Sequence, residues 1–206
     1  IDPEMSVQRI ALADNDKLLS LLPVAAADVE VILPLTPMQR DLYLDTLMDP
    51  HNRRNYFGWI HRIDTSIDAD RLQAALDIVT AQYSALRMRI VAGQKDWMDV
   101  GYSVILRAGS EQSRIHLQPF DWSNQGLSEA EFNRRCNNEL AFKPYDLANE
   151  PIIRFFLIKE SETQWAIVLT AHHSCIDGIS LQTITDSYSR VYESLSNDTS
   201  YTLVED

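Results

Sequence analysis

The sequence has few cysteines, few glycines and no long apolar segment, and each shortage excludes a class of protein. Its two cysteines, Cys136 and Cys175, cannot build a disulfide framework, and their spacing matches no zinc-binding pattern. They indicate reduced thiols, as in a cytosolic protein. No apolar run approaches the about 20 residues of a membrane span, and no signal peptide is visible. Only 6 Gly and 8 Pro occur in 206 residues, so we expect a soluble cytoplasmic protein with a packed core.

Positive charge is also scarce. The chain has 18 Lys and Arg against 30 Asp and Glu, which gives a formal net charge of −12. A domain this acidic repels phosphate backbones and anionic lipid, so binding to nucleic acid or to a membrane surface is disfavoured. We expect partners that are neutral, zwitterionic or locally basic.

The order of elements predicts an α/β protein with helices packed on a mixed sheet. Residues 1–4, ahead of Met5, are interpreted as a cloning remnant, residues 5–32 as a lead-in, and residues 33–206 as the folded unit. Capping residues and apolar periodicity favour helices, and alternation favours strands. The last helix should bury an apolar stripe of Ile179, Ile184, Tyr188, Val191 and Leu195. Expected helices cover 36–48, 68–83, 128–142 and 178–195, and expected strands cover 56–65, 86–91, 97–106, 114–120, 152–159 and 165–171.

The segment most informative about chemistry is HHSCIDG at residues 172–178, where a buried strand ends and a helix begins. Strand side chains alternate, so His172 and His173 should point to opposite faces. Asp177 is by default a helix N-cap, and Gly178 would permit a tight turn. The opposite orientation of the histidines and the lack of a third ligand nearby disfavour a metal site. Ser174 and Cys175 are poor candidates for a nucleophile, because residues so close in sequence seldom align with a base.

Four segments, in order, resemble the core motifs of condensation domains of nonribosomal peptide synthetases. HHSCIDG is similar to the third motif, HHxxxDG. LPLTPMQR at 33–40, continuing to Leu47, resembles the first motif, YSALRMRI at 83–90 resembles the second, and YDLANEPIIR at 145–154 resembles a run that precedes the family's hairpin. In the second motif Tyr83, Met88 and Ile90 replace the usual His, Thr and Phe, which concerns the subtype, and Arg87 is retained.

The resemblance implies a chloramphenicol-acetyltransferase-like fold, and the chain looks like the N-terminal lobe of a two-lobe domain. It implies amide bond formation between two thioesters carried on the phosphopantetheine arms of donor and acceptor carrier domains. The lobe itself would bind no cofactor and no metal. Its partners would be those carriers, the C-terminal lobe of the same domain and adjacent synthetase domains. We expect the isolated lobe to be inactive.

The resemblance also implies residue roles. His173 would be the catalytic imidazole, His172 its buried partner, and Gly178 a donor of a backbone N–H to the site. For Asp177 two interpretations stay open: a bidentate pair with Arg87, whose strand should share a sheet with the histidine strand, or a simple helix cap. Three alternative functions also stay open: an epimerisation domain, another HxxxD acyltransferase lobe, or a non-catalytic module that binds carrier domains.

Overall fold

The computed structural model describes residues 22–93 and 100–197 of the chain. Expectations for residues 1–4, for most of the lead-in and for the start of the 97–106 strand lie outside these residues. The helices are α2 (Pro37–Met48), α3 (Ala69–Gln82), α4 (Glu129–Arg135) and α5 (Gly178–Ser196). The strands are β1 (Val29–Pro34), β2 (Tyr56–Ile63), β3 (Met88–Ala92), β4 (Gly101–Leu106), β5 (Leu117–Asp121), β6 (Ile153–Lys159) and β7 (Trp165–His172).

The helices begin where capping side chains satisfy their first free N–H groups. Thr36 accepts from the N–H of Gln39 at 3.2 Å, and Gln39 accepts in return from the N–H of Thr36 at 3.0 Å. Asp68 caps α3, and Ser128 forms a second capping box at α4. Each cap stabilises its helix by about 1 kcal/mol. The helix starts predicted from sequence are therefore confirmed.

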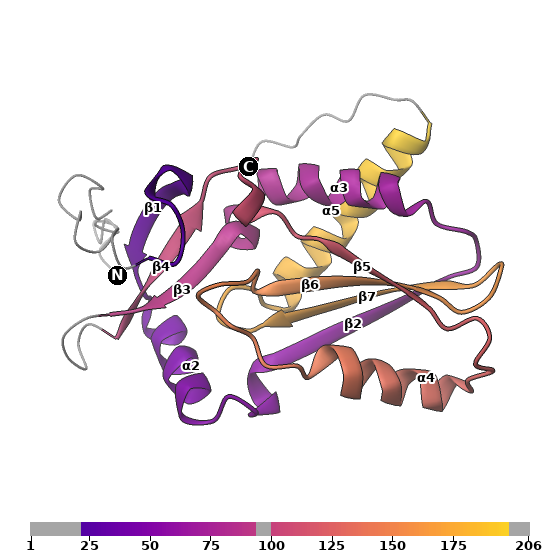
Figure 1. Cartoon of the computed structure of the whole chain (residues 1–206), viewed down its shortest axis with the longest axis horizontal. Coiled ribbons are helices and arrows are strands. Elements are labelled where there is room, and N and C mark those ends of the chain that lie inside the picture. Colours follow the sequence, from indigo (N-terminus) through magenta and orange to yellow (C-terminus); the bar gives the residue numbers. More distant parts are fainter. Residues whose placement is uncertain (1–21, 94–99, 198–206) are drawn as a thin grey trace.

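The strands form two sheets rather than one (Figure 1). The first is antiparallel, with the order β1-β4-β3. The second is mixed, with the order β2-β7-β6-β5, because β5 runs parallel to β6 while the other pairs are antiparallel. β6 and β7 form an antiparallel hairpin, and the histidine segment lies at the end of β7.

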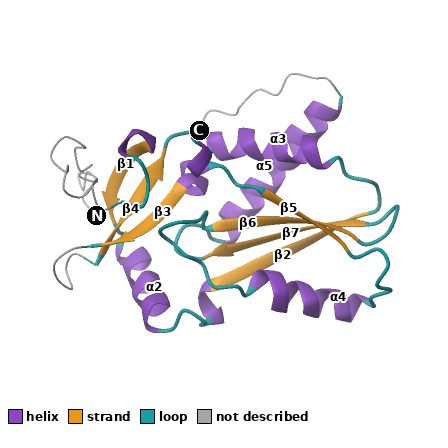
Figure 2. Ribbon diagram, in the orientation of Figure 1, coloured by secondary structure: helices purple, strands orange, loops and turns teal. Residues whose placement is uncertain are grey.

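Helices cover both faces of the four-stranded sheet (Figure 2). Apolar side chains of α3 and α5 pack on one face, against Phe155 and Leu169 among others. On the other face, α4 and the π-helical turn Cys136–Ala141 that follows it pack on Phe156 and Val168. The alternation of β6 and β7 therefore buries both of their sides, and the predicted α/β class with a mixed sheet is confirmed.

Two details differ from the sequence-based expectation. β1 begins at Val29, which is fully buried, so the strand crosses the boundary at residue 33 that we expected for the folded unit. Ile179 was expected in the buried stripe of α5 but is 81% exposed, because it lies in the first turn, ahead of the contact with the sheet. Of the later members of that stripe, Ile184, Tyr188 and Val191 are buried as predicted, and Leu195 is half-buried.

A third apolar cluster joins the two sheets and positions the site. Tyr43 of α2 packs with Met88 and Ile90 of β3, and the same cluster includes Tyr56 at the start of β2 and Tyr145. The antiparallel register pairs Tyr56 with His172. The cluster therefore brings α2, which packs on the small sheet, against the histidine end of the large sheet.

Candidate active site

The end of β7 places the two histidines on opposite sides, as the alternation predicted. His172 is 0% exposed, whereas His173 is exposed. The N–H of His172 donates to the carbonyl of Ile152 at 3.0 Å, and the N–H of His173 donates to the carbonyl of Asn55 at 2.8 Å. These bonds continue the strand geometry to the last residue, so one ring faces the interior and the other faces outward.

The ring of His172 is hydrogen-bonded at both nitrogens. The N–H of Ser174 donates to Nδ1 at 3.2 Å, and the Ser174 hydroxyl lies 2.8 Å from the same atom. Because a backbone N–H can only donate, Nδ1 of the neutral ring is the acceptor and Nε2 carries the proton. Nε2 lies 2.8 Å from Oγ1 of Thr46 and donates to it.

The environment of His172 keeps its ring neutral. Tyr56 packs edge-on with a centroid distance of 5.4 Å, and Tyr145 lies at 6.2 Å. Burial, with a smaller contribution from the neighbouring His173, lowers the pKa of His172 to about 4. At neutral pH this imidazole is a hydrogen-bonding element of the core rather than a proton acceptor.

Two residues that the sequence analysis missed hold His172 from α2 and from the turn before β2. The Thr46 hydroxyl donates to the carbonyl of Leu42 at 2.8 Å and accepts from His172. Asn55 Nδ2 lies 2.8 Å from Asp45 Oδ2 and 3.3 Å from Thr46 Oγ1. No local pattern in the sequence marks these residues, because their partner is more than a hundred positions away.

His173 presents a free imidazole at the surface. Its ring contacts Phe57 at a centroid distance of 4.7 Å and a tilt of 48°. Within residues 22–93 and 100–197, its ring nitrogens have no hydrogen-bond partner. An exposed imidazole on a fixed backbone can accept a proton from an incoming amine or hydrogen-bond to it.

Asp177 and Gly178 form the entrance to α5. Asp177 Oδ1 accepts from the N–H of Ser180 at 2.8 Å, and this bond holds the pKa of the carboxyl below its usual value. The carboxylate is thus a helix cap. Gly178 has no positive φ, and a Cβ added to it would meet no atom within 4 Å. The backbone conformation and the space at this position therefore do not require glycine.

The expected pair between Asp177 and Arg87 does not form. Arg87 lies directly before β3 in the three-stranded sheet, not in the sheet of β7. Its guanidinium, 5% exposed, donates to the carbonyl of Thr80 at 3.1 Å, to the carbonyl of Leu106, and to Glu30 at 2.5 Å. Arg87 thereby ties α3 to β1 and β4 at a distance from the histidines in the fold.

Ser174 and Cys175 lack what a nucleophile needs. Ser174 contacts an imidazole, but both groups are sealed in the interior, which leaves no approach for a substrate. The Cys175 thiol lies 3.6 Å from the carbonyl of His172, not near a ring nitrogen, and burial raises its pKa. A buried thiol of this kind stays protonated and unreactive.

Within the described parts of the chain, no group of three or more His, Cys, Asp or Glu side chains is placed to hold a metal ion. None of the helices in those parts combines the length and apolarity that crossing a bilayer requires.

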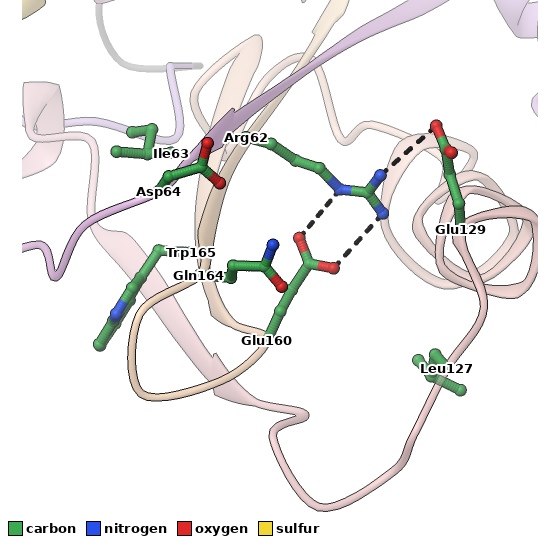
Figure 3. A pocket seen from close by; sticks show the side chains of 8 residues that line it. All are labelled: Arg62, Ile63, Asp64, Leu127, Glu129, Glu160, Gln164 and Trp165. Atoms are coloured by element: carbon green, nitrogen blue, oxygen red, sulfur yellow. Dashed lines mark hydrogen bonds and ion pairs between the residues drawn. The ribbon is translucent and has the colours of Figure 1, made fainter.

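A polar hollow of about 190 Å³ lies at the opposite end of β2 and β7 (Figure 3). Arg62 lies between two carboxylates there, 3.0 Å from Glu160 and 3.5 Å from Glu129. The charges of Arg62, Glu129 and Glu160 therefore compensate one another. It is separated from the histidines by seven strand positions, or about 24 Å.

Comparisons with known proteins point to one family. The family profile described as "Condensation domain" matches residues 29–205. The chain is 26% identical over 174 residues to the nonribosomal peptide synthetase easA of Emericella nidulans, and 24% identical over 175 residues to tyrocidine synthase 2 of Brevibacillus parabrevis. Each alignment covers 84% of this chain but only 2% and 4% of the relatives, respectively.

Solved structures agree in fold. The first condensation domain of the calcium-dependent antibiotic synthetase, in complex with a substrate analogue, matches with a TM-score of 0.71 and 23% identity. The starter condensation domain of rhizomide synthetase RzmA matches with a TM-score of 0.69 and 19% identity. Each match covers 83% of this chain, but only 39% and 41% of those chains. The described residues therefore correspond to about two fifths of the solved chains.

Proposed function

This chain belongs to the condensation domain family, and from that premise we propose that it supplies the catalytic histidine for amide bond formation between two carrier-bound thioesters. The acceptor amine attacks the donor carbonyl, the new C–N bond forms, and the C–S bond to the donor phosphopantetheine breaks. The amine loses its proton, and the donor thiolate leaves. No covalent enzyme intermediate is needed, because the thioester is already activated.

The observation that carries this proposal is the contrast between the two rings. His172 is buried, bonded at both nitrogens and neutral, while His173 is exposed with free ring nitrogens on a backbone held by Asn55. This arrangement supports two separate roles, in which His172 stabilises the end of the strand and His173 contacts the substrate.

The chemistry fits an imidazole. An α-amino group has a pKa near 8, so much of it is protonated at neutral pH, whereas an ordinary imidazole has a pKa of about 6.5 and can accept a proton. Such a group contributes about 100-fold or more to a rate when it is positioned well. Orienting the neutral amine by a hydrogen bond to the same ring would add to this. Gly178, next to open space, leaves room for a substrate.

We further propose that turnover requires the rest of the condensation domain. The chain spans about two fifths of the solved domains that it matches, and His173 faces outward rather than into a closed cavity. The remaining lobe would form the opposite wall of the substrate channel. Donor and acceptor carrier domains would deliver the phosphopantetheine arms, and the reaction would take place in the cytoplasm.

The test is a condensation assay with two loaded carrier domains, read by mass spectrometry of the product thioester. The complete domain that contains this chain should form the amide, whereas the 206-residue chain alone should not exceed the uncatalysed rate. An arm with acyl-CoA donors separates condensation from other HxxxD acyl transfer. A second arm follows the α-carbon stereochemistry of a single loaded carrier, which would reveal epimerisation instead.

The decisive variant is His173→Ala in the complete domain. It should lower the rate of amide formation by about 100-fold or more. His116→Ala is the matched control, because it removes another exposed ring, one that contacts Glu111 on a different element. Equal rates for the His173→Ala domain and the unmodified domain would refute the proposed role.

A further inference from the structure

We propose that Thr46 of α2 is a positioning residue: it accepts the Nε2–H of His172 and thereby holds the backbone that carries His173. This inference rests on the proposed function of His173, but it assigns a role to Thr46, which had none in the sequence-based expectations. It starts from the contact between Nε2 of His172 and Oγ1 of Thr46 at 2.8 Å, which joins α2 to the end of β7.

The hydroxyl of Thr46 is fully used. It donates its one proton to the carbonyl of Leu42 at 2.8 Å, and it accepts from His172 and from Asn55 Nδ2 at 3.3 Å. A hydroxyl has one donor and two acceptor positions, so no spare direction remains. Thr46 is 7% exposed, and water cannot readily replace it. The ring of His172 is therefore fixed in orientation and in tautomer by protein groups alone.

Asn55 connects the same contact to His173. Its side chain bonds Thr46 and Asp45, and its carbonyl accepts the N–H of His173 at 2.8 Å. His173 is thus held by the strand end through His172 and by the turn before β2 through Asn55. Loss of the Thr46 hydroxyl removes the acceptor of His172 and one of the bonds of Asn55, which keeps its bond to Asp45. Both supports of the His173 backbone are thereby weakened.

The experiment records ring and backbone protons of the 206-residue chain by nuclear magnetic resonance. The Nε2–H of His172 should be visible at neutral pH as a proton protected from solvent, bonded to Nε2 and not to Nδ1. In Thr46→Val, which keeps the shape but removes the acceptor, this proton should shift upfield or exchange away. Thr46→Ser should restore it. A ring proton on Nδ1 in the unmodified chain overturns the proposal without any variant.

The second readout is hydrogen exchange at the His173 N–H. Thr46→Val should accelerate it on the order of 10-fold or more, which corresponds to the loss of one buried hydrogen bond. Thr183→Val is the matched control, because Thr183 makes the same hydroxyl bond to a carbonyl four residues back, at 3.1 Å, on the exposed side of α5. If the exchange rate of the His173 N–H rises no more than the rates of the core amides of β6, the variant is destabilised as a whole, and the positioning role of Thr46 is overturned.

These readouts do not depend on turnover. A protected Nε2–H together with an inactive complete domain refutes the proposed function and leaves the contact standing. An active domain in which Thr46→Val changes neither the ring proton nor the exchange at His173 refutes the role of Thr46 alone.

Discussion

The buried His172 should make the fold sensitive to acid in a defined window. Its pKa is lowered to about 4 in the folded chain, against about 6.5 for an ordinary imidazole. Between these two values the unfolded chain binds a proton that the folded chain does not bind. Stability is therefore full above about pH 6.5 and falls as the pH is lowered to about 4, below which both states are protonated.

The magnitude follows from the size of the shift. A difference of about 2.5 pKa units corresponds to about 3 kcal/mol at 1.36 kcal/mol per unit, which is a large share of the stability of a domain. The physical source is the desolvation of the ring, which has hydrogen-bond partners only for its neutral form. Both partners, the N–H of Ser174 and the hydroxyl of Thr46, are arranged for a ring that accepts at Nδ1 and donates at Nε2.

The assay compares the unmodified chain with His172→Gln by urea unfolding at pH steps from 7.5 to 4. The amide can keep one donor and one acceptor but cannot titrate, and the carboxylates common to both proteins cancel in the difference. The difference in free energy of unfolding should change by about 3 kcal/mol across the window, in favour of the variant at low pH. His116→Gln, a surface change, should follow the unmodified chain. A difference that stays constant from pH 7 to 4 would refute the reasoning.

Three other predictions concern stability and rate. Arg87→Gln should lower the free energy of unfolding by about 2 kcal/mol, because it leaves buried carbonyls unpaired, and Asp177→Ala should lower it by about 1 kcal/mol through loss of the helix cap. Urea unfolding of the double variant should show additive losses, and strong coupling would contradict the separate roles of the two residues. Gly101→Ala should cost about 1–3 kcal/mol because its Cβ would lie 2.7 Å from a backbone carbonyl oxygen, whereas Gly178→Ala should melt within a few degrees of the unmodified chain. His173→Ala should also have nearly the melting temperature of the unmodified chain in calorimetry, because the ring that it removes is exposed.

Local signals in the sequence were sufficient for the helix starts and the strand that carries the histidines. Thr36, Asp68 and Ser128 cap their helices as expected, because capping depends on residues three positions apart. The opposite orientation of His172 and His173 followed from strand alternation alone. These features are set within a few residues, and the chain needs no distant contact to specify them.

Features that depend on the pairing of distant segments could not be predicted in this way. The separation into two sheets decides that Arg87 lies beside β1 and β4, and this made the expected contact with Asp177 wrong. The role of Thr46 could not be predicted for the same reason, because a threonine within a helix carries no local sign of a partner 126 positions away. The helix pattern of α5 also failed at Ile179, where periodicity continues but the sheet has ended.

The polar contacts of the candidate site lie between two units that are each stabilised separately. α2 packs through Tyr43 on the three-stranded sheet, while His172 ends a central strand of the four-stranded sheet. Apolar packing between such units is tolerant of small shifts, whereas a hydrogen bond of 2.8 Å is sensitive to its distance and angle. The bond from His172 to Thr46 therefore fixes the position of the end of β7 relative to α2, and with it the position of the neighbouring His173 backbone. A buried imidazole that is neutral at pH 7 can in this way hold the backbone of the exposed imidazole beside it.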